Sequence, residues 1–199
     1  MERERSILFP RGALAVLAGA ALVGTTLLGP DALAGGSAPP DIRMIDVKGS
    51  DTPKVVAKGV IDQPPEKVWQ VVSECASYKK RMPRIEASRL VKQEGNKHTC
   101  EVTIAMPFPL SNLTAVTEAV HEVSDQGMSR RWKLVRGDYK FNQGSWEVKP
   151  HDGGKKSLVV YTVHAEPNTS LPGWIREAAQ KKAIPELFER VGEEAAKMK

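Results

Sequence analysis

The residues able to carry chemistry are few, and their spacing forms no familiar catalytic or metal-binding motif. The four histidines are His98, His121, His151 and His164, and none belongs to a His-Glu-x-x-His or cysteine–histidine cluster. The serines lack the Gly-x-Ser-x-Gly elbow of hydrolases, and neither a Walker loop nor a dinucleotide fingerprint occurs. We therefore expect no metal and no cofactor. His164, close to the end of a predicted strand, is expected to have a structural role.

Cys75 and Cys100 are the only cysteines, and two outcomes are open for them. In an oxidising compartment the pair could form a disulfide. Two isolated cysteines also serve as small buried apolar side chains. Because the sequence does not give the distance between them, the choice rests on geometry. We expect buried free thiols, with the disulfide as the alternative.

The first 34 residues predict an export signal. A charged start is followed by an uncharged run over residues 12–29, and Ala32-Leu33-Ala34 supplies the small residues that a signal peptidase reads. An uncleaved membrane anchor is the alternative, since about 18 apolar residues is near the minimum that spans a bilayer. The glycine and alanine content makes the run weakly hydrophobic, so we favour cleavage near Ala34.

The mature protein is then expected to be periplasmic or secreted, with one domain over residues 54–199. Residues 35–53 are expected to be a linker, in which the apolar cluster of Ile42, Met44, Ile45 and Val47 could form one short strand. A net charge of +5 is modest, and no zinc-finger or RNA-binding motif is present, so nucleic acid is not an expected partner. Transient contact with an anionic membrane surface is compatible with this charge. It would involve a basic run with nearby apolar tips: Lys79, Lys80, Arg81, Arg84, Phe108 and Leu110.

Hydrophobic periodicity predicts the elements that must position these side chains. Apolar residues at three- and four-residue steps predict a helix over residues 171–199, with a bend or a fresh start near Pro185. Alternating patterns predict one strand, then two helices that begin after Pro64-Pro65, then six further strands. The predicted strands cover residues 55–62, 85–93, 97–106, 113–123, 128–136, 139–149 and 155–165. Short connections make neighbouring strands antiparallel.

This order predicts an α+β fold in which an antiparallel sheet of six to seven strands curls around a long C-terminal helix. Two short helices follow the first strand. A helix laid across the concave face leaves space between helix and sheet.

The order and several local patterns resemble the START/polyketide-cyclase superfamily, which has the helix-grip fold, over about residues 54–195. The residues that carry the resemblance are 59–69, Tyr78 with Met82-Pro83, Pro107-Phe108-Pro109, Gly144-Ser145-Trp146, and Tyr161 with 171–175 and 182–185. Ser111-Asn112-Leu113-Thr114 departs from the pattern, because many relatives have an Arg-Asp pair there. The resemblance implies a cavity that holds a lipid, sterol, polyketide or quinone, and a few members catalyse cyclisation.

We expect the cavity wall to come from the concave face of the sheet and from the long helix. The predicted ligand-binding residues are Val102, Ile104, Met106, Trp132, Leu134, Trp146, Val159, Tyr161, Val163, Ile175, Ala179 and Leu187. Trp132, Trp146 and Tyr161 stand out because each combines apolar area with one hydrogen-bonding tip. Tyr161 could orient a carbonyl or hydroxyl group of the ligand.

The functional expectation is an exported carrier or sensor of a hydrophobic small molecule (lipid, quinone or polyketide-like), without covalent chemistry. The alternative is an aromatase/cyclase-type enzyme acting on a polyketide-like substrate, with Tyr161 or His164 as general acid or base. A third interpretation is an interaction module whose cavity has collapsed.

Overall fold

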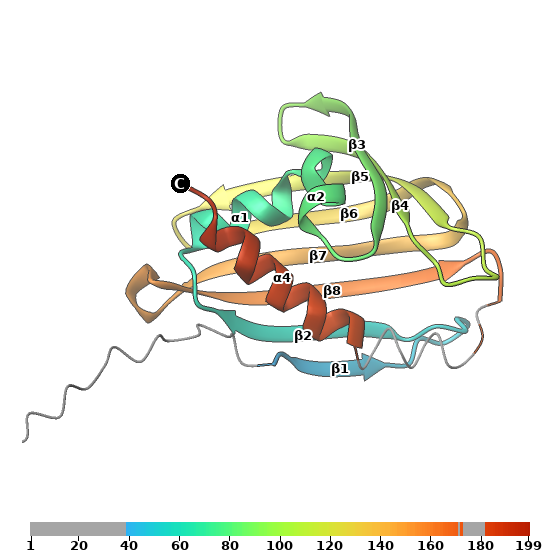
Figure 1. The fold of residues 1–199 in the computed structure, drawn as a ribbon, viewed down its shortest axis with the longest axis horizontal. Helices are drawn as coiled ribbons and strands as arrows, with labels where there is room; N and C mark the ends of the chain where they lie inside the picture. Colours follow the sequence, from blue (N-terminus) through green and yellow to red (C-terminus); the bar gives the residue numbers. More distant parts are fainter. Residues whose placement is uncertain (1–38, 171, 173–181) are drawn as a thin grey trace, which may run out of the picture. The chain divides into compact units, whose positions relative to one another are not determined.

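The computed structural model describes residues 39–170, 172 and 182–199, and an antiparallel sheet dominates this part of the chain. Its strand order is β1-β2-β8-β7-β6-β5-β4-β3 (Figure 1). The strands are β1 (Asp41–Ile45), β2 (Lys54–Ile61), β3 (Ile85–Glu94), β4 (Lys97–Ile104), β5 (Leu113–Ser124), β6 (Gly127–Gly137), β7 (Tyr139–His151) and β8 (Lys156–Pro167). The predicted α+β fold is therefore confirmed.

The sheet has eight strands, one more than the upper end of the expected range. The additional strand, β1, lies in the segment expected to be a linker with room for one short strand, and it pairs along β2, from Asp41 opposite Lys58 to Ile45 opposite Lys54. Only Ile42, Met44 and Ile45 give this strand an apolar signal, and most of its side chains are exposed. Pairing with a long neighbouring strand, a non-local effect, is what completes its backbone hydrogen bonds.

The helices gather on one face of the sheet (Figure 1). They are α1 (Pro65–Ser73), α2 (Tyr78–Arg81) and α4 (Ile184–Ala196), and two single 3₁₀ turns, η1 (Cys75–Ser77) and η2 (Asp152–Gly154), complete the described elements. Proline in the first turn of both α1 and α4 suits positions whose N–H groups have no helical partner. Residues 171 and 173–181 lie outside the description, so the predicted bend near Pro185 stays a prediction.

The core lies where α1 and α4 pack against each other and against the sheet. Phe188 and Val191 of α4 are buried here with Val148 and Val159 of the sheet. Gly59 in β2 permits this close approach, because a Cβ at that position would lie 3.1 Å from the Phe188 ring. No helix within residues 39–170 or 182–199 is long and apolar enough to cross a membrane.

A disulfide joins Cys75 of η1 to Cys100 of β4, with an S–S distance of 1.96 Å. The expectation of free thiols is therefore wrong. The β3–β4 hairpin brings the two Cα atoms to 6.3 Å, within the span that a disulfide bridges. Both sulfurs are buried in the core, so the cross-link ties the helical segment after α1 to β4, the strand next to the β3 edge of the sheet.

Candidate functional site

A cavity of about 460 Å³ lies on the face of the sheet that carries the helices, and every strand contributes to its wall. Alternate residues of a strand point to the same face, so each strand supplies only one to four side chains. α2 contributes Tyr78, and α4 contributes Ile184 and Leu187. Most of the wall is apolar. Its polar or partly polar side chains are those of Thr52, Tyr78, Arg84, Thr117, Arg130, Trp132, Tyr139, Asn142, Trp146 and Tyr161.

Eight of the twelve predicted ligand-binding residues lie on this wall. They are Val102, Ile104, Met106, Trp132, Trp146, Tyr161, Val163 and Leu187. Ile175 and Ala179 lie outside the described residues. Position on the wall is a geometric finding, and a contact with a ligand stays a prediction for each of them.

Leu134 and Val159 are not among the residues of the cavity wall, so their predicted contact with a ligand has no support from the position of the cavity. Leu134 packs against the apolar cluster formed by Leu113, Ala115 and Tyr139. Val159 is fully buried in the core with Phe188. Both share the inward face of their strands, but neighbouring side chains cover them.

An aromatic cluster forms one side of the cavity. Trp146 and Tyr161 occupy directly opposite positions on β7 and β8, with ring centroids 4.4 Å apart. Trp132 stacks beside Tyr161 at 6.1 Å, and its indole Nε1 donates a hydrogen bond to Asn142 Oδ1 at 3.0 Å. Burial raises the pKa of Tyr161, so the phenol stays protonated and can donate a hydrogen bond.

Gly144 makes room for this cluster. A Cβ on this residue would lie 2.5 Å from the Trp132 ring and closer still to the backbone oxygen of Thr162. The glycine in Gly144-Ser145-Trp146 is therefore required by the close packing of Trp132 over β7. This packing requirement explains why a glycine occupies the first position of that motif.

Arg130 is a cavity residue that our sequence reasoning missed. Its guanidinium lies between two rings, 5.3 Å from the Trp132 centroid and 5.8 Å from that of Tyr78. Only 4% of the residue is exposed, and Nε has no hydrogen-bond partner among the described residues. The signal that could have found it is the two-residue spacing from Trp132, which places both side chains on the inward face of β6.

Tyr78 is also on the wall, and its hydroxyl donates to the backbone oxygen of Val72 in α1. Burial raises the pKa of this phenol, an effect that the positive charge of Arg130 partly offsets. Its hydrogen-bonding capacity as a donor is thus used within the protein. Tyr78 contributes its ring face to the cavity.

His98 and His121 form a pair beside the core, with ring centroids 4.0 Å apart. Trp69 of α1 meets the His121 ring edge-on at 5.3 Å. Burial, with smaller effects from His98 and Arg130, lowers the pKa of His121 to about 4. This imidazole is therefore neutral at neutral pH.

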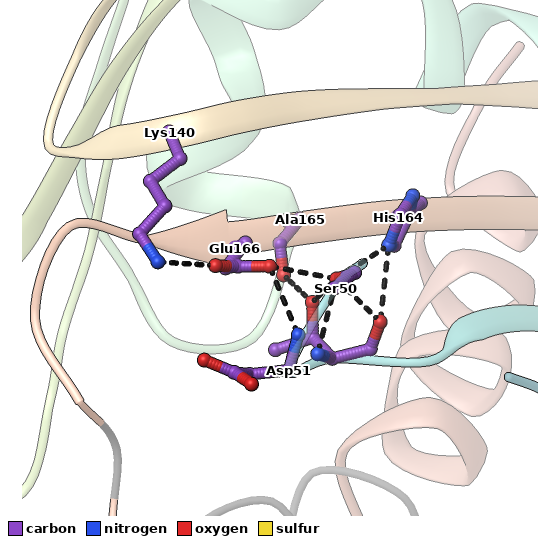
Figure 2. A network of polar contacts seen from close by, with 7 residues as sticks. Ser50, Asp51, Lys140, His164, Ala165 and Glu166 are labelled. Atoms are coloured by element: carbon purple, nitrogen blue, oxygen red, sulfur yellow. Dashed lines mark hydrogen bonds and ion pairs between the residues drawn. The ribbon is translucent and has the colours of Figure 1, made fainter. Parts of the chain in front are cut away.

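His164 takes part in a polar network rather than in the cavity wall (Figure 2). Its Nε2 lies 3.0 Å from the backbone oxygen of Thr52 and 3.1 Å from Ser50 Oγ. Ser50 Oγ donates to Glu166 at 2.7 Å, and Lys140 Nζ lies 2.5 Å from the other carboxylate oxygen. The hydrogen bonds from Lys140 and Ser50 lower the pKa of Glu166 to about 2. The network holds the β1–β2 connection against β7 and β8, and it borders a smaller polar pocket of about 240 Å³.

The loop after β4 and the residue before β3 meet at the rim of the cavity. The Ala105 N–H donates to the Arg84 oxygen at 2.8 Å, and both residues contribute to the wall together with Pro107. Phe108, next along the loop, is 94% exposed. Arg84 forms an ion pair with Glu186 of α4 at 3.2 Å. The rim thus combines an exposed aromatic side chain with the basic side chain of Arg84.

Comparisons with known proteins agree with this architecture. The family model described as polyketide cyclase / dehydrase and lipid transport matches residues 61–191. A search of curated protein sequences finds no match. Among solved structures, the STAR-related lipid transfer protein from Xanthomonas axonopodis (fragment 25-204) has a TM-score of 0.66 and 20% identity, over 80% of this chain and 98% of that chain.

Two further structures illustrate the range of similar proteins. Human STARD10 has a TM-score of 0.68 and 17% identity, over 81% of this chain and 74% of that chain. An aromatase/cyclase from Streptomyces sp. R1128 has a TM-score of 0.59 and 12% identity, over 73% of this chain and 95% of that chain. At these identities the likeness concerns the fold.

Proposed function

Because this chain belongs to the polyketide cyclase / dehydrase and lipid transport family, we propose that it is an exported carrier or sensor of a hydrophobic small molecule. The observation that carries the proposal is the cavity of about 460 Å³ with its largely apolar wall. Cavities of roughly 300–1,000 Å³ with a few polar groups are typical of small-molecule sites. Apolar burial gives about 25 cal/mol per Å², so a ligand burying about 300 Å² gains about 7 kcal/mol before the cost of association.

The test is mass spectrometry of an organic extract from the purified protein, expressed as the full chain. We expect a co-purifying hydrophobic molecule in the wild type and its loss in Ala165→Phe, which places a phenyl ring in the cavity. Val135→Phe is the matched control, because Val135 is 55% exposed. Equal ligand content in the wild type and Ala165→Phe, or an empty wild-type protein that binds no added lipid, would contradict the proposal.

Export rests on the N-terminal sequence pattern, and the buried disulfide supports it, since disulfides persist in oxidising compartments. We expect the protein recovered outside the cytoplasm to begin near Gly35. Intact-mass measurement distinguishes this cleavage from an uncleaved anchor, which would leave the full chain in the membrane fraction.

Membrane docking for ligand uptake or release would use the rim of the cavity. We expect flotation with vesicles that contain anionic phospholipid, driven by the basic residues and the exposed Phe108 ring. Changing Lys79, Lys80, Arg81 and Arg84 to Ser should reduce flotation. Changing Lys92, Lys97, Lys149 and Lys155 to Ser is the charge-matched control. Equal flotation of the two variants would remove the docking proposal.

An aromatase/cyclase activity is the second candidate, favoured by the protonated Tyr161 phenol on the cavity wall. His164, the other group considered, is engaged in the polar network instead. Turnover of a poly-β-ketone substrate that Tyr161→Phe abolishes would establish the enzyme over the carrier.

A further inference from the structure

Arg130 presents an electrostatic problem that the described residues do not solve. The residue is 4% exposed, and its Nε lacks a hydrogen-bond partner among the described residues. Its guanidinium forms no ion pair with any carboxylate in the described part of the chain, and only the faces of Tyr78 and Trp132 accompany it. A buried charge without a partner is costly, so such groups are normally paired.

The neighbours of Arg130 on its own face supply no negative charge. Trp146 on β7 and His121 on β5 lie directly opposite it in the register. His121 is neutral, because its pKa is lowered to about 4 by burial and, less strongly, by His98 and Arg130. The hydroxyl of Tyr78 is bonded to Val72. The missing partner must therefore come from outside the described wall, and the cavity is where the guanidinium is open to it.

A single planar guanidinium matches one carboxylate in both charge and shape. Two parallel N–H···O hydrogen bonds satisfy the fork geometry, and the pair is neutral overall. A phosphate monoester carries about −1.5 to −2 at neutral pH and would leave negative charge buried beside apolar side chains. Arg84, the other arginine on the wall, is already paired with Glu186 at the rim.

We propose that the natural ligand is an acidic amphiphile whose carboxylate pairs with Arg130 inside the cavity. This proposal rests on the proposed function and specifies the class of ligand. At about 30 Å³ for each water-sized group, the cavity of about 460 Å³ holds about fifteen such groups. A single-chain carboxylate of medium length fits this volume.

The experiment compares two probes that share one alkyl chain, sodium dodecanoate and 1-dodecanol, by isothermal titration calorimetry on the delipidated protein, expressed as the full chain. We expect wild type to bind dodecanoate at least about tenfold more tightly, the effect of one charge-assisted contact. Arg130→Met should abolish or reverse this preference and leave dodecanol affinity within about threefold of wild type. Arg131→Met is the matched control, since the adjacent side chain is 53% exposed and pairs with Glu122. It should keep the preference.

A stability measurement separates this role from a packing role. If Arg130 is unpaired in the absence of an anionic ligand, Arg130→Met should raise the melting temperature of the ligand-free protein, because the substitution removes an unpaired buried charge. If the guanidinium serves only to pack between the two rings, the variant should melt lower and the wild-type preference should be absent. That result would overturn the proposal.

Three other outcomes of the binding experiment also test the proposal. Equal affinity of wild type for dodecanoate and dodecanol would overturn the assignment while leaving the carrier function standing, and this arm needs no variant. Tighter binding of dodecyl phosphate than of dodecanoate would overturn the choice of a carboxylate. Failure to bind any of the three probes would count against the carrier function itself and against this assignment.

Discussion

The Cys75–Cys100 disulfide should contribute strongly to the stability of the domain, and reducing it is a direct perturbation. The bond closes a segment with a sequence separation of 25 residues that contains α2 and the β3–β4 hairpin turn. Both sulfurs lie in the core, so a reductant has little access to them in the native state. Reduction should therefore proceed mainly through unfolding.

The magnitude follows from the size of the closed loop. Restricting an unfolded chain over 25 residues corresponds to about 3.5 kcal/mol of folding free energy at 25 °C in the loop-entropy description. For a domain of 150–250 residues, each kcal/mol shifts the melting temperature by about 2–4 °C. Loss of the cross-link should then lower the melting temperature by about 7–14 °C.

The assay is urea unfolding followed by far-UV circular dichroism, with the protein oxidised or reduced in denaturant and refolded under dithiothreitol. Reduction retains both sulfur atoms, so it isolates the cross-link from packing. Cys75→Ala/Cys100→Ala gives the combined effect and should be less stable again. A reduced protein that loses less than about 1 kcal/mol would refute the reasoning.

Three further perturbations address the packing and the titrating groups. Gly144→Ala should destabilise the fold by about 1–3 kcal/mol, because its methyl group would overlap the Trp132 ring and the next strand; urea unfolding measures this, and unchanged stability would contradict the packing argument. Glu166→Gln should have a lower melting temperature than wild type at pH 7. The difference should shrink as the pH falls from 4.5 towards about 2, because the folded wild type then binds a proton at Glu166 and loses the interaction of the carboxylate with Lys140. A gap that stays constant between pH 7 and pH 2.5 would show that the charge is unimportant. Wild type should lose stability as the pH falls from 6.5 to about 4, because the unfolded His121 binds a proton in this range and the folded one does not. His121→Phe should remove this loss, which is at most about 3 kcal/mol. Parallel pH profiles of melting temperature for the variant and wild type would contradict this.

Local patterns in the sequence were sufficient for the element order. The strands alternate clearly, Pro64-Pro65 marks the start of α1, and short connections make the sheet antiparallel. The family resemblance over about residues 54–195 is confirmed by the match over residues 61–191. The element order depends on residues that are neighbours along the chain, so the amino-acid sequence by itself indicates it.

The site was harder to predict, because alternation gives the face of a strand but not what covers it. Val159 and Val163 share the inward face of β8, yet Val159 lies under Phe188 and Val163 borders the cavity. Gly59, which lies opposite Val159 on β2, leaves room for Phe188 of α4 at this position. No pattern within β8 contains that information.

The charge of Arg130 is the reason that sequence reasoning did not place this residue on the cavity wall. Arg130 occupies an inward position two residues from Trp132, but a charged residue normally indicates the solvent side. The disulfide was missed for a different reason, since the distance between Cys75 and Cys100 depends on how η1 packs over the β3–β4 hairpin. Tertiary contacts decide both cases.

The way in which all eight strands share the cavity wall bears on how such proteins diversify. Each inward side chain alternates with an outward one that belongs to a different environment. A single substitution can therefore alter the shape of the cavity while the opposite face of the sheet and the hydrogen bonds between its strands stay the same. Sequences that share this sheet can therefore change the cavity in small steps and diverge widely while the scaffold is retained.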